Sequence, residues 1–286
     1  MFYKSTSASG GADGSSAGLN KRPASRRTFD APVHRPKERE MIFGIRAVIE
    51  AVDAGKTLDK VLLRRDMSSA LAKELLERLE KVGSQGVTQV QRVPVERLNQ
   101  FTDKNHQGVI AFLSPVDFFR VEDLVQAAFE RGETPLVMVL DGITDVRNFG
   151  AIARTCACAG VHALVIPARG SASVNGDAVK TSAGALHSLP VCKVDNLQDT
   201  LRYLRDSGLA LVAATEHASL SYTAADLTRP LAIVMGSEEK GIFDANLRLC
   251  TDRVRIPITG TIESLNVSVA AGVMLFEALR QRTLDS

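Results

Sequence analysis

The segment Arg255-Ile-Pro-Ile-Thr-Gly-Thr-Ile-Glu-Ser-Leu-Asn-Val-Ser-Val-Ala-Ala271 decides how the C-terminal part of this chain is built. It has the pattern of a strand end, a polar turn and the start of a helix that runs to about Arg280. Pro257 has no N–H for a central ladder, so it favours a strand edge or the start of a loop. Ser264 or Asn266 is suited to cap the helix. Such a loop gathers free backbone N–H groups, so it can hold a small ligand through main-chain contacts.

Two earlier stretches have the same form, an apolar run that breaks into glycine, asparagine, serine and acidic residues. One runs from Val137 to Thr155 and the other from Leu231 to Gly241. Continuous apolar strands between helical segments predict an α/β domain with a mostly parallel sheet covered on both faces. Strands are expected at residues 136–140, 163–166, 189–194, 210–214, 231–235 and 253–258, and helices at 121–131, 149–159, 177–185, 197–207, within 244–249 and at 267–280.

In this order the three stretches resemble the three motifs of the SpoU (TrmH) family of RNA ribose 2′-O-methyltransferases, in the SPOUT superfamily. The matching residues are Asn148, Gly150 and Arg154, then Gly236-Ser237-Glu238, then Ser264-Leu265-Asn266-Val267-Ser268. The resemblance implies a deep trefoil knot in the last part of the domain, which is an exception to the rule that chains do not thread loops. It also implies a homodimer with the active site near the subunit interface.

The resemblance further implies that S-adenosylmethionine is the methyl donor and that no metal is needed. The catalytic candidates carried over are Arg154, Asn148, Glu238, Ser264 and Asn266. Arg154 is expected to activate the ribose hydroxyl by stabilising developing negative charge; the alternative is a structural arginine bonded to helix or loop carbonyls. Asn148, Ser264 and Asn266 have helix capping as their alternative. Glu238 would orient Arg154 or Asn266, or would simply be an exposed acid.

The cofactor-binding candidates are Gly236, Ile256 and Leu265, which carry over from the binding loops of the family. Glycine has no Cβ, so Gly236 is expected to let the backbone come close to the ligand. The alternative is that Gly236 only supplies a turn conformation. Many family members have Asp-Pro where this chain has Asp145-Val-Arg147, and the missing proline leaves that loop less rigid.

The methyltransferase domain is expected at residues 118–286, after a smaller module at 41–113 and a linker around Ser114-Pro. Alternating helices and strands in the module, the first helix from Ile42 to Val52, predict a three-layer α/β sandwich. Its order and the stretch Asn105-His-Gln-Gly-Val109 resemble the L30e-like substrate-binding domain of the family. Candidate RNA contacts, each with an ordinary solvated residue as the alternative, are Arg46, Arg64, Arg65, Lys104, Asn105 and His106, and His106 has a turn-shaping role as a further alternative.

Residues 1–40 are rich in Ser, Gly and Arg and lack hydrophobic periodicity, so we expect a disordered tail. The tail holds eight basic and four acidic residues, whereas the whole chain has a net charge of +2. The remainder of the chain is therefore slightly acidic. A basic tail favours a polyanion such as RNA through phosphate contacts; the alternative is a solvated tail with no role.

No apolar run approaches the roughly 20 residues of a membrane span, and no secretory signal is recognisable. The four cysteines Cys156, Cys158, Cys192 and Cys250 are expected to be buried, reduced thiols of a cytosolic protein, with metal ligation beside His162 as the alternative. The resemblance in motifs and two-domain layout implies an enzyme that methylates the ribose of a guanosine in 23S rRNA, and we expect it to be cytoplasmic. The alternatives are a tRNA ribose methyltransferase and a non-catalytic RNA-binding factor in ribosome assembly.

Overall fold

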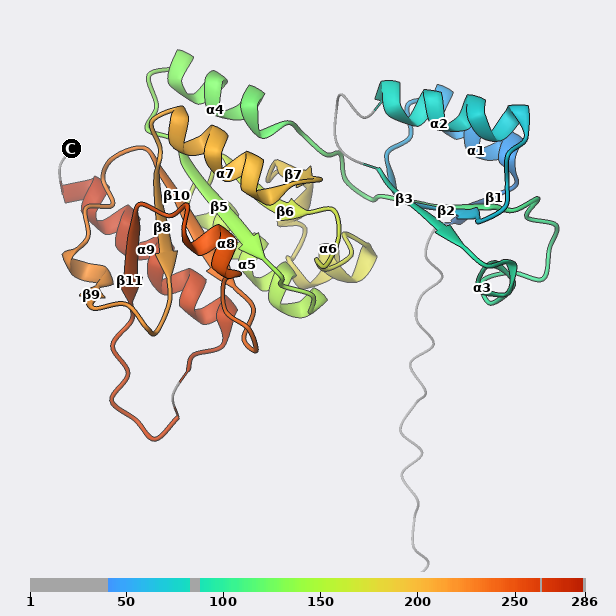
Figure 1. The fold of residues 1–286 in the computed structure, drawn as a ribbon. Helices are drawn as coiled ribbons and strands as arrows, with labels where there is room; N and C mark the ends of the chain where they lie inside the picture. Colours follow the sequence, from blue (N-terminus) through green and yellow to red (C-terminus); the bar gives the residue numbers. More distant parts are fainter. Residues whose placement is uncertain (1–40, 83–87, 263, 285–286) are drawn as a thin grey trace, which may run out of the picture. The chain divides into compact units, whose positions relative to one another are not determined.

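A computed structural model of the chain describes residues 41–82, 88–262 and 264–284. The tail expected at residues 1–40 lies outside this part of the chain. The described residues contain two sheets, one of four strands and one of seven, each with helices on both faces (Figure 1).

The four-stranded sheet has the order β1-β4-β2-β3, in which β2 and β3 are parallel and the other pairs are antiparallel. Helices α1 and α2 pack on one face and α3 packs on the other, so the three-layer prediction is confirmed. The bounds are β1 (Met41–Phe43), α1 (Ile45–Asp53), β2 (Leu58–Arg64), α2 (Ala70–Val82), β3 (Gln89–Val93), α3 (Val95–Asn99) and β4 (Val109–Leu113).

The first helix of this module begins later than the sequence pattern predicts. We expected a helix from Ile42, but Met41–Phe43 is a strand that pairs with Ile110–Phe112 of β4. Gly44, with φ of 91°, turns the chain from this strand into α1. Apolar residues at 41–43 satisfy a strand as well as a helix, and only the pairing with β4 distinguishes the two.

The seven-stranded sheet has the order β7-β6-β5-β10-β8-β11-β9, and all its pairs are parallel. The predicted parallel sheet is thus confirmed, with the short strand β9 as an addition. The strand expected at Arg253–Ile258 ends earlier, at Arg255, two residues before Pro257. The bounds are β5 (Leu136–Asp141), β6 (Ala163–Pro167), β7 (Val191–Val194), β8 (Ala210–Ala214), β9 (Leu220–Ser221), β10 (Leu231–Gly236) and β11 (Asp252–Arg255).

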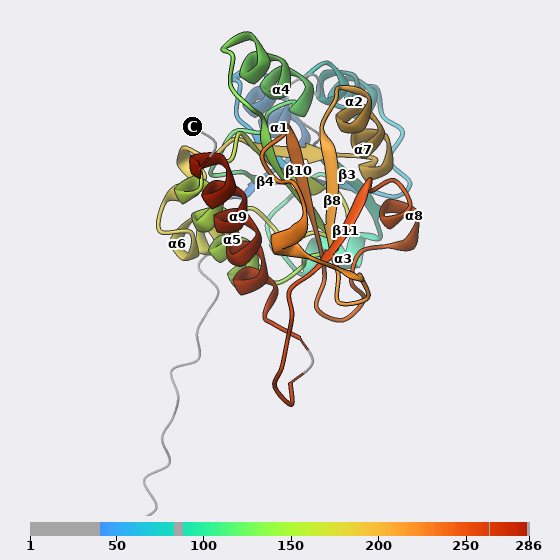
Figure 2. The ribbon, with the colours of Figure 1, turned by 90° about the vertical axis from the view of Figure 1, so that its left-hand side faces the viewer.

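Helices cover both faces of this sheet (Figure 2). One face carries α5 (Val146–Cys158), α6 (Gly176–Thr181) and α9 (Val267–Leu284), and the other carries α4 (Val121–Glu130), α7 (Leu197–Asp206) and α8 (Asp244–Leu247). Two short 3-10 turns, η2 (Ala185–His187) and η3 (Tyr222–Ala224), complete the domain. Met138 of β5 faces the first core, whereas its neighbour Val139 faces the second, as strand alternation requires.

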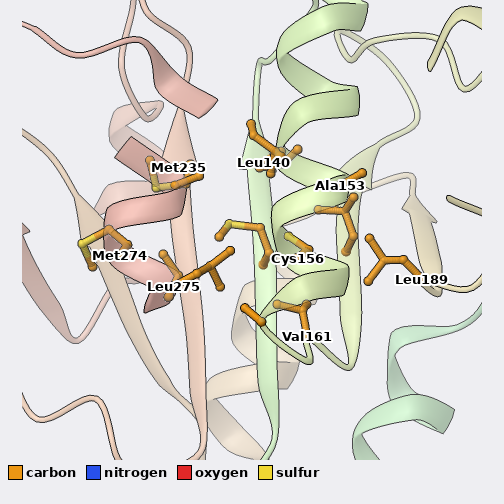
Figure 3. Close-up of a cluster of buried hydrophobic side chains, with 14 of the residues drawn as sticks. Leu140, Ala153, Cys156, Val161, Leu189, Met235, Met274 and Leu275 are labelled. Atoms are coloured by element: carbon orange, nitrogen blue, oxygen red, sulfur yellow. The ribbon is translucent and has the colours of Figure 1, made fainter. Parts of the chain in front are cut away.

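The first core fixes α5 and α9 against the centre of the sheet. Figure 3 shows Met235 of β10 and Leu140 of β5 in one cluster with Cys156 of α5 and Leu275 of α9. On its other side α5 approaches α6 so closely that a Cβ on Gly150 would lie 2.6 Å from a Thr181 carbon. The start of α5 is therefore held by packing from two sides, which matters because the first motif lies there.

The cysteines differ in burial. Cys156 and Cys192 are buried, and burial raises the pKa of both thiols well above the usual range. Cys250 is half-buried, and burial raises the pKa of its thiol to about 12. Cys158 is exposed, so the expectation of a buried thiol is wrong there. It faces outward because it is two positions from Cys156 on one helix. Among the described residues, no helix is long and apolar enough to span a membrane.

Candidate active site

The three motif loops meet at one edge of the seven-stranded sheet. They follow β5, β10 and β11, which run parallel, so their carboxyl ends point the same way. β5 and β10 are direct neighbours, with Gly236 in register with Asp141. The loop after β11, residues 256–266, leads back to α9, which packs against α5 on one face of the sheet. Segments more than 100 residues apart in sequence therefore come together at this edge.

Three side chains, one from each motif, bond to one another and form what we call the polar triangle: Asn148, Glu238 and Asn266. Glu238 Oε1 accepts from Asn266 Nδ2 at 2.7 Å and from Asn148 Nδ2 at 3.3 Å. Asn266 Nδ2 also donates to Asn148 Oδ1 at 3.0 Å. The contact that we expected between Glu238 and Asn266 is present. In the part of the chain that the structure describes, no hydrogen bond joins Glu238 to Arg154.

Asn148 does not cap α5, so that alternative is wrong. Asp145 is the cap, and its Oδ1 accepts from Arg147 N at 2.7 Å and Asn148 N at 3.1 Å. The hydrogen bond from Asn148 N is the largest cause that lowers the pKa of the Asp145 carboxyl, and Arg147 lowers it further. Because the cap is supplied by Asp145, the Asn148 side chain is free to join the polar triangle.

Asn266 caps α9, as its alternative predicted, and its contact with the ribose hydroxyl or a ligand stays a prediction. Its Oδ1 accepts from Ser268 N at 3.0 Å at the start of α9, while its Nδ2 belongs to the polar triangle. Glu238 Oε1 also accepts from Val267 N at 3.1 Å, so a residue of the second motif satisfies a free N–H of this helix. Ser264 is exposed and makes no hydrogen bond within the described residues, so its capping alternative is wrong.

Arg154 lies on the exposed side of α5. It comes six residues after Asn148, which is about 9 Å along the helix axis and roughly 120° from Asn148 around it. Among the described residues it has no hydrogen bond and no ion pair, so the alternative of a structural arginine bonded to carbonyls is wrong. Its guanidinium is available to an anion outside this chain.

The surroundings of Gly236 differ from our expectation. A Cβ at this position would stand 2.1 Å from Gly241 C and 2.2 Å from Ile242 N. The space that we expected beside the ligand is filled by the loop's own backbone, which folds back through hydrogen bonds between Ser237 and Gly241 of 3.1 and 2.9 Å. The missing side chain therefore lets the loop close on itself, and contact of its main-chain groups with the cofactor stays a prediction.

The loop after β11 has the chemistry of a main-chain binding site. In its described residues 256–262 and 264–265, no backbone N–H or C=O is hydrogen-bonded to the rest of the described chain. Ile256 is half-buried against the core, and Leu265 is 38% exposed. Unpaired backbone groups beside apolar side chains suit a ligand with a flat ring and a polar edge, as adenosine has. Within the described residues no group of three or more His, Cys, Asp or Glu side chains is placed to hold a metal.

In the N-terminal module, His106 has a structural role. It is 9% exposed, its Nε2 lies 2.9 Å from Asn99 Oδ1, and its Nδ1 accepts from Gly108 N at 3.0 Å. The turn-shaping alternative is confirmed, and direct RNA contact by this side chain is contradicted by its burial. Arg64 pairs with Asp66 at 2.8 Å. Direct RNA contact stays a prediction for half-buried Arg64 and for the exposed residues Arg46, Arg65, Lys104 and Asn105.

A hollow of about 590 Å³, which we call the site hollow, opens beside the polar triangle. Two of its residues were missed by sequence reasoning. Asp141, 3% exposed, accepts from Phe243 N and Asn246 Nδ2, both at 2.8 Å, and Phe243 is 52% exposed. An acid at the end of an apolar strand was a signal for Asp141, whereas nothing in the sequence singled out Phe243. The hollow is lined by Asp141–Asp145, Asn148, Pro167, Arg169, Gly170, Leu197, Ser237–Lys240, Phe243 and Val267.

Two family profiles match this chain. Residues 135–276 match the SpoU rRNA Methylase family, and residues 41–119 match the RNA 2′-O ribose methyltransferase substrate binding family. These matches cover both sheets.

Curated relatives match over most of their length. The 23S rRNA (guanosine-2′-O-)-methyltransferase RlmB of Photobacterium profundum is 37% identical over 248 residues, which cover 86% of this chain and 99% of that protein. The corresponding enzyme of Escherichia coli K12 is 35% identical over 85% of this chain and 99% of its own length. The putative TrmH family tRNA/rRNA methyltransferase YacO of Bacillus subtilis is 33% identical over 86% of this chain and 97% of its own length.

Solved structures agree with these matches. The SpoU methyltransferase AviRb of Streptomyces viridochromogenes, in complex with the cofactor AdoMet, aligns with a TM-score of 0.53 and 27% identity. That alignment covers 85% of this chain and 90% of AviRb. An AdoMet-bound rRNA methyltransferase of Sinorhizobium meliloti aligns with a TM-score of 0.53 and 25% identity over 84% of this chain and 86% of that one.

Proposed function

The chain belongs to the SpoU family of RNA methyltransferases, and on that premise we propose that it methylates the ribose 2′-hydroxyl of a guanosine in 23S rRNA. The observation that carries the proposal is the polar triangle, because it joins one side chain from each of the three motifs. Capping of α9 explains Asn266 and Glu238 in part, whereas Asn148 joins the set although Asp145 already caps α5. The relatives named for guanosine methylation of 23S rRNA support the choice of substrate.

S-adenosylmethionine supplies a methyl group on a positively charged sulfur, so the transfer to oxygen requires no metal. The residues that fit this cofactor are the closed loop 236–241 and residues 256–262 and 264–266, through main-chain groups and the apolar side chains of Ile256 and Leu265. A trefoil knot formed by these loops belongs to the proposal. The AdoMet-bound relatives support the choice of cofactor.

The chain's own residues orient the hydroxyl and stabilise charge. Asn148 and Asn266 present amide groups that Glu238 holds in one arrangement, so they can position the ribose without first reorganising. Arg154 carries a guanidinium with no partner among the described residues, and when it lies beside the oxygen of a bound ribose it would stabilise the negative charge that develops during transfer. Ser264, at the end of the cofactor loop, is a further candidate contact.

A homodimer is part of the proposal. The first part of α9, Val267 to Phe276, has apolar or small residues on all sides, which is typical of a helix segment that is covered everywhere. Its core-facing side is buried, while Val269 is 52%, Phe276 51% and Leu279 37% exposed along its outer side. These three residues follow a helical spacing, so they form one stripe. A second copy of the chain is the occupant we propose, and Arg154 on the neighbouring α5 would then act close to the interface.

The proposed enzyme works in the cytoplasm, where ribosomal RNA is made and assembled. The N-terminal module would bind the RNA through Arg46, Arg65, Lys104 and Asn105, and the basic tail would add salt-sensitive affinity. The choice between rRNA and tRNA is tested by mapping 2′-O-methyl groups in both RNAs with and without this gene. Loss of a methyl group from a guanosine of 23S rRNA is the expected result, and loss only from a tRNA would contradict it.

Arg154→Ala tests the chemistry. We expect a loss of methyl transfer of at least 100-fold, because one charge-stabilising donor is typically worth that much. Calorimetry should show nearly unchanged cofactor binding, since Arg154 is not in the cofactor loops. Arg202→Ala is the matched control, because Arg202 is an exposed arginine on α7, on the opposite face of the sheet. Activity of Arg154→Ala within a few-fold of wild type would contradict the proposed role.

A further inference from the structure

The site hollow contains a feature that the methyl-transfer chemistry leaves unexplained. Phe243 is 52% exposed and lines the hollow, although large apolar side chains are usually turned inward. Asn148 and Glu238 of the polar triangle line the same hollow. An exposed aromatic ring therefore stands in one cavity with the groups that would meet the ribose.

The backbone of Phe243 is held in place although its ring is exposed. Its N–H donates to the buried carboxylate of Asp141 at 2.8 Å. Its carbonyl accepts from Asn246 N at 2.8 Å and Leu247 N at 2.9 Å. The edge of the ring lies 3.4 Å from the position that a Cβ would take on Gly142. The ring is therefore positioned before a ligand arrives. A ligand that stacks on it pays only a small conformational-entropy cost.

The charges of the hollow decide what chemistry can enter it. Its lining includes four carboxylates, those of Asp141, Asp145, Glu238 and Glu239, against the two cations Arg169 and Lys240. This excess of negative charge disfavours a phosphate inside the hollow but suits a neutral nucleobase, whose N–H groups donate to carboxylates. A volume of about 590 Å³ is within the range of small-molecule sites and leaves room for one base.

We propose that the site hollow receives the base of the nucleotide whose ribose is methylated, and that this base stacks on the ring of Phe243. This inference rests on the proposed RNA methyltransferase function and adds the residue that holds the substrate base. Stacking on an aromatic ring selects an unpaired base, because a base inside a helix has both faces covered. Arg169 and Lys240, both exposed, would then meet the flanking phosphates at the rim.

The chain contains no tryptophan, so Phe243→Trp introduces a single indole that can report on stacking. The probe is an unmethylated 23S rRNA fragment that carries the mapped nucleotide, added to the full chain with its cofactor. We expect the indole fluorescence of Phe243→Trp to be quenched as the RNA binds. Phe129→Trp is the matched control, because Phe129 is 42% exposed and does not line the hollow. It lies on α4, which leads into the amino end of β5. Its fluorescence should stay unchanged.

Phe243→Ala supplies the second measurement. Base–aromatic stacking is worth roughly 5- to 150-fold in binding per base, so we expect the KM for this RNA to rise about tenfold or more. Phe243→Tyr should restore the wild-type value, and the melting temperature and cofactor affinity of all variants should stay near those of the wild type. A KM within twofold of wild type for Phe243→Ala, or an unquenched Phe243→Trp, would overturn the inference. Absence of methyl transfer by the wild-type protein would instead contradict the proposed function.

Discussion

Helices α5 and α9 both begin beside the polar triangle, but their first turns are held in different ways. At α5, Asp145 accepts from Arg147 N and Asn148 N, so the cap and the helix are neighbours in sequence. At α9, Asn266 supplies a local cap, and Glu238, 29 residues before Val267, accepts from Val267 N. The start of α5 is therefore fixed by local sequence, whereas the start of α9 also needs a distant loop.

Because of this difference, we expect mutations to affect the α5 side and the α9 side of the site differently. A helix with a local cap begins correctly whenever the helix itself folds. The α9 side depends on the closure of the loop 236–241, because that loop carries Glu238. A mutation in that loop should therefore disturb both the start of α9 and the polar triangle. A mutation of Asp145 should disturb only the start of α5.

The largest effect is expected for Gly236→Ala. The new Cβ would stand 2.1 to 2.4 Å from backbone atoms of Gly241 and Ile242, so the loop cannot close. We expect a loss of about 3 kcal/mol in unfolding free energy, at the upper end for overpacking. Thermal and urea melts measure it. Gly260→Ala in the other cofactor loop is the control, because the nearest atom to its Cβ is 4.0 Å away. Equal stability of the two variants would contradict this account of Gly236.

Glu238→Ala should come next. It leaves Asn148 Nδ2, Asn266 Nδ2 and Val267 N without their shared acceptor, so the polar triangle loses its arrangement. We expect at least a 100-fold loss of methyl transfer, comparable to removing a catalytic donor. Stability should fall by about 1 kcal/mol, because the groups involved are mostly exposed and water replaces part of the lost bonding. Glu238→Gln keeps an acceptor oxygen and should retain more activity than Glu238→Ala. Lower activity of Glu238→Gln than of Glu238→Ala would contradict the role of the polar triangle in methyl transfer.

Asp145→Ala is expected to have a smaller effect that is confined to α5. Loss of an N-cap typically costs about 1 kcal/mol in unfolding free energy. Methyl transfer should drop only several-fold, because Glu238 still bonds Asn266 and Val267. Denaturant melts and a methylation assay measure the two quantities. A loss of activity as large as that of Glu238→Ala would show that the two helix starts are not independent.

Asp145→Asn should have the smallest effect at neutral pH, since asparagine is also a good N-cap. The fold lowers the pKa of the Asp145 carboxyl, chiefly through the bond from Asn148 N, so the charged form stabilises the native state. That contribution is present above the unfolded pKa of about 3.9 and is lost as the pH falls through the lower, folded value. Wild type should thus exceed Asp145→Asn slightly in melting temperature at pH 7, and the difference should shrink below about pH 4. A constant difference would contradict the charge effect.

Much of the fold was predictable because its signals are local. The apolar runs that became β5, β10 and β8 are continuous, and the parallel sheet follows from their alternation with helices. The three motifs also identified Asn148, Glu238 and Asn266 as members of one site. The misreading of Met41–Phe43 has a tertiary cause, since the pairing with β4 lies almost 70 residues away.

The detailed geometry of the site was not predictable for a similar reason. Asp145 as the cap of α5 depends on where the helix begins, and the start was predicted at Phe149 when it is Val146. The space around Gly236 is occupied by a backbone segment that the sequence does not place. Phe243 became a candidate only because the hollow and the Asp141 anchor place its ring beside the polar triangle.

One oxygen atom, Glu238 Oε1, accepts hydrogen bonds from Asn148, Asn266 and Val267. This arrangement imposes an order in time on the formation of the site. A chain that grows from its N-terminus at roughly 5 to 20 residues per second has Asn148 first, then Glu238, and Asn266 last. The first two motifs can pair through β5 and β10 while the third is still being made. The polar triangle is therefore complete only after Asn266 has been made and α9 has folded onto α5, so the site forms later than the pairing of its first two motifs.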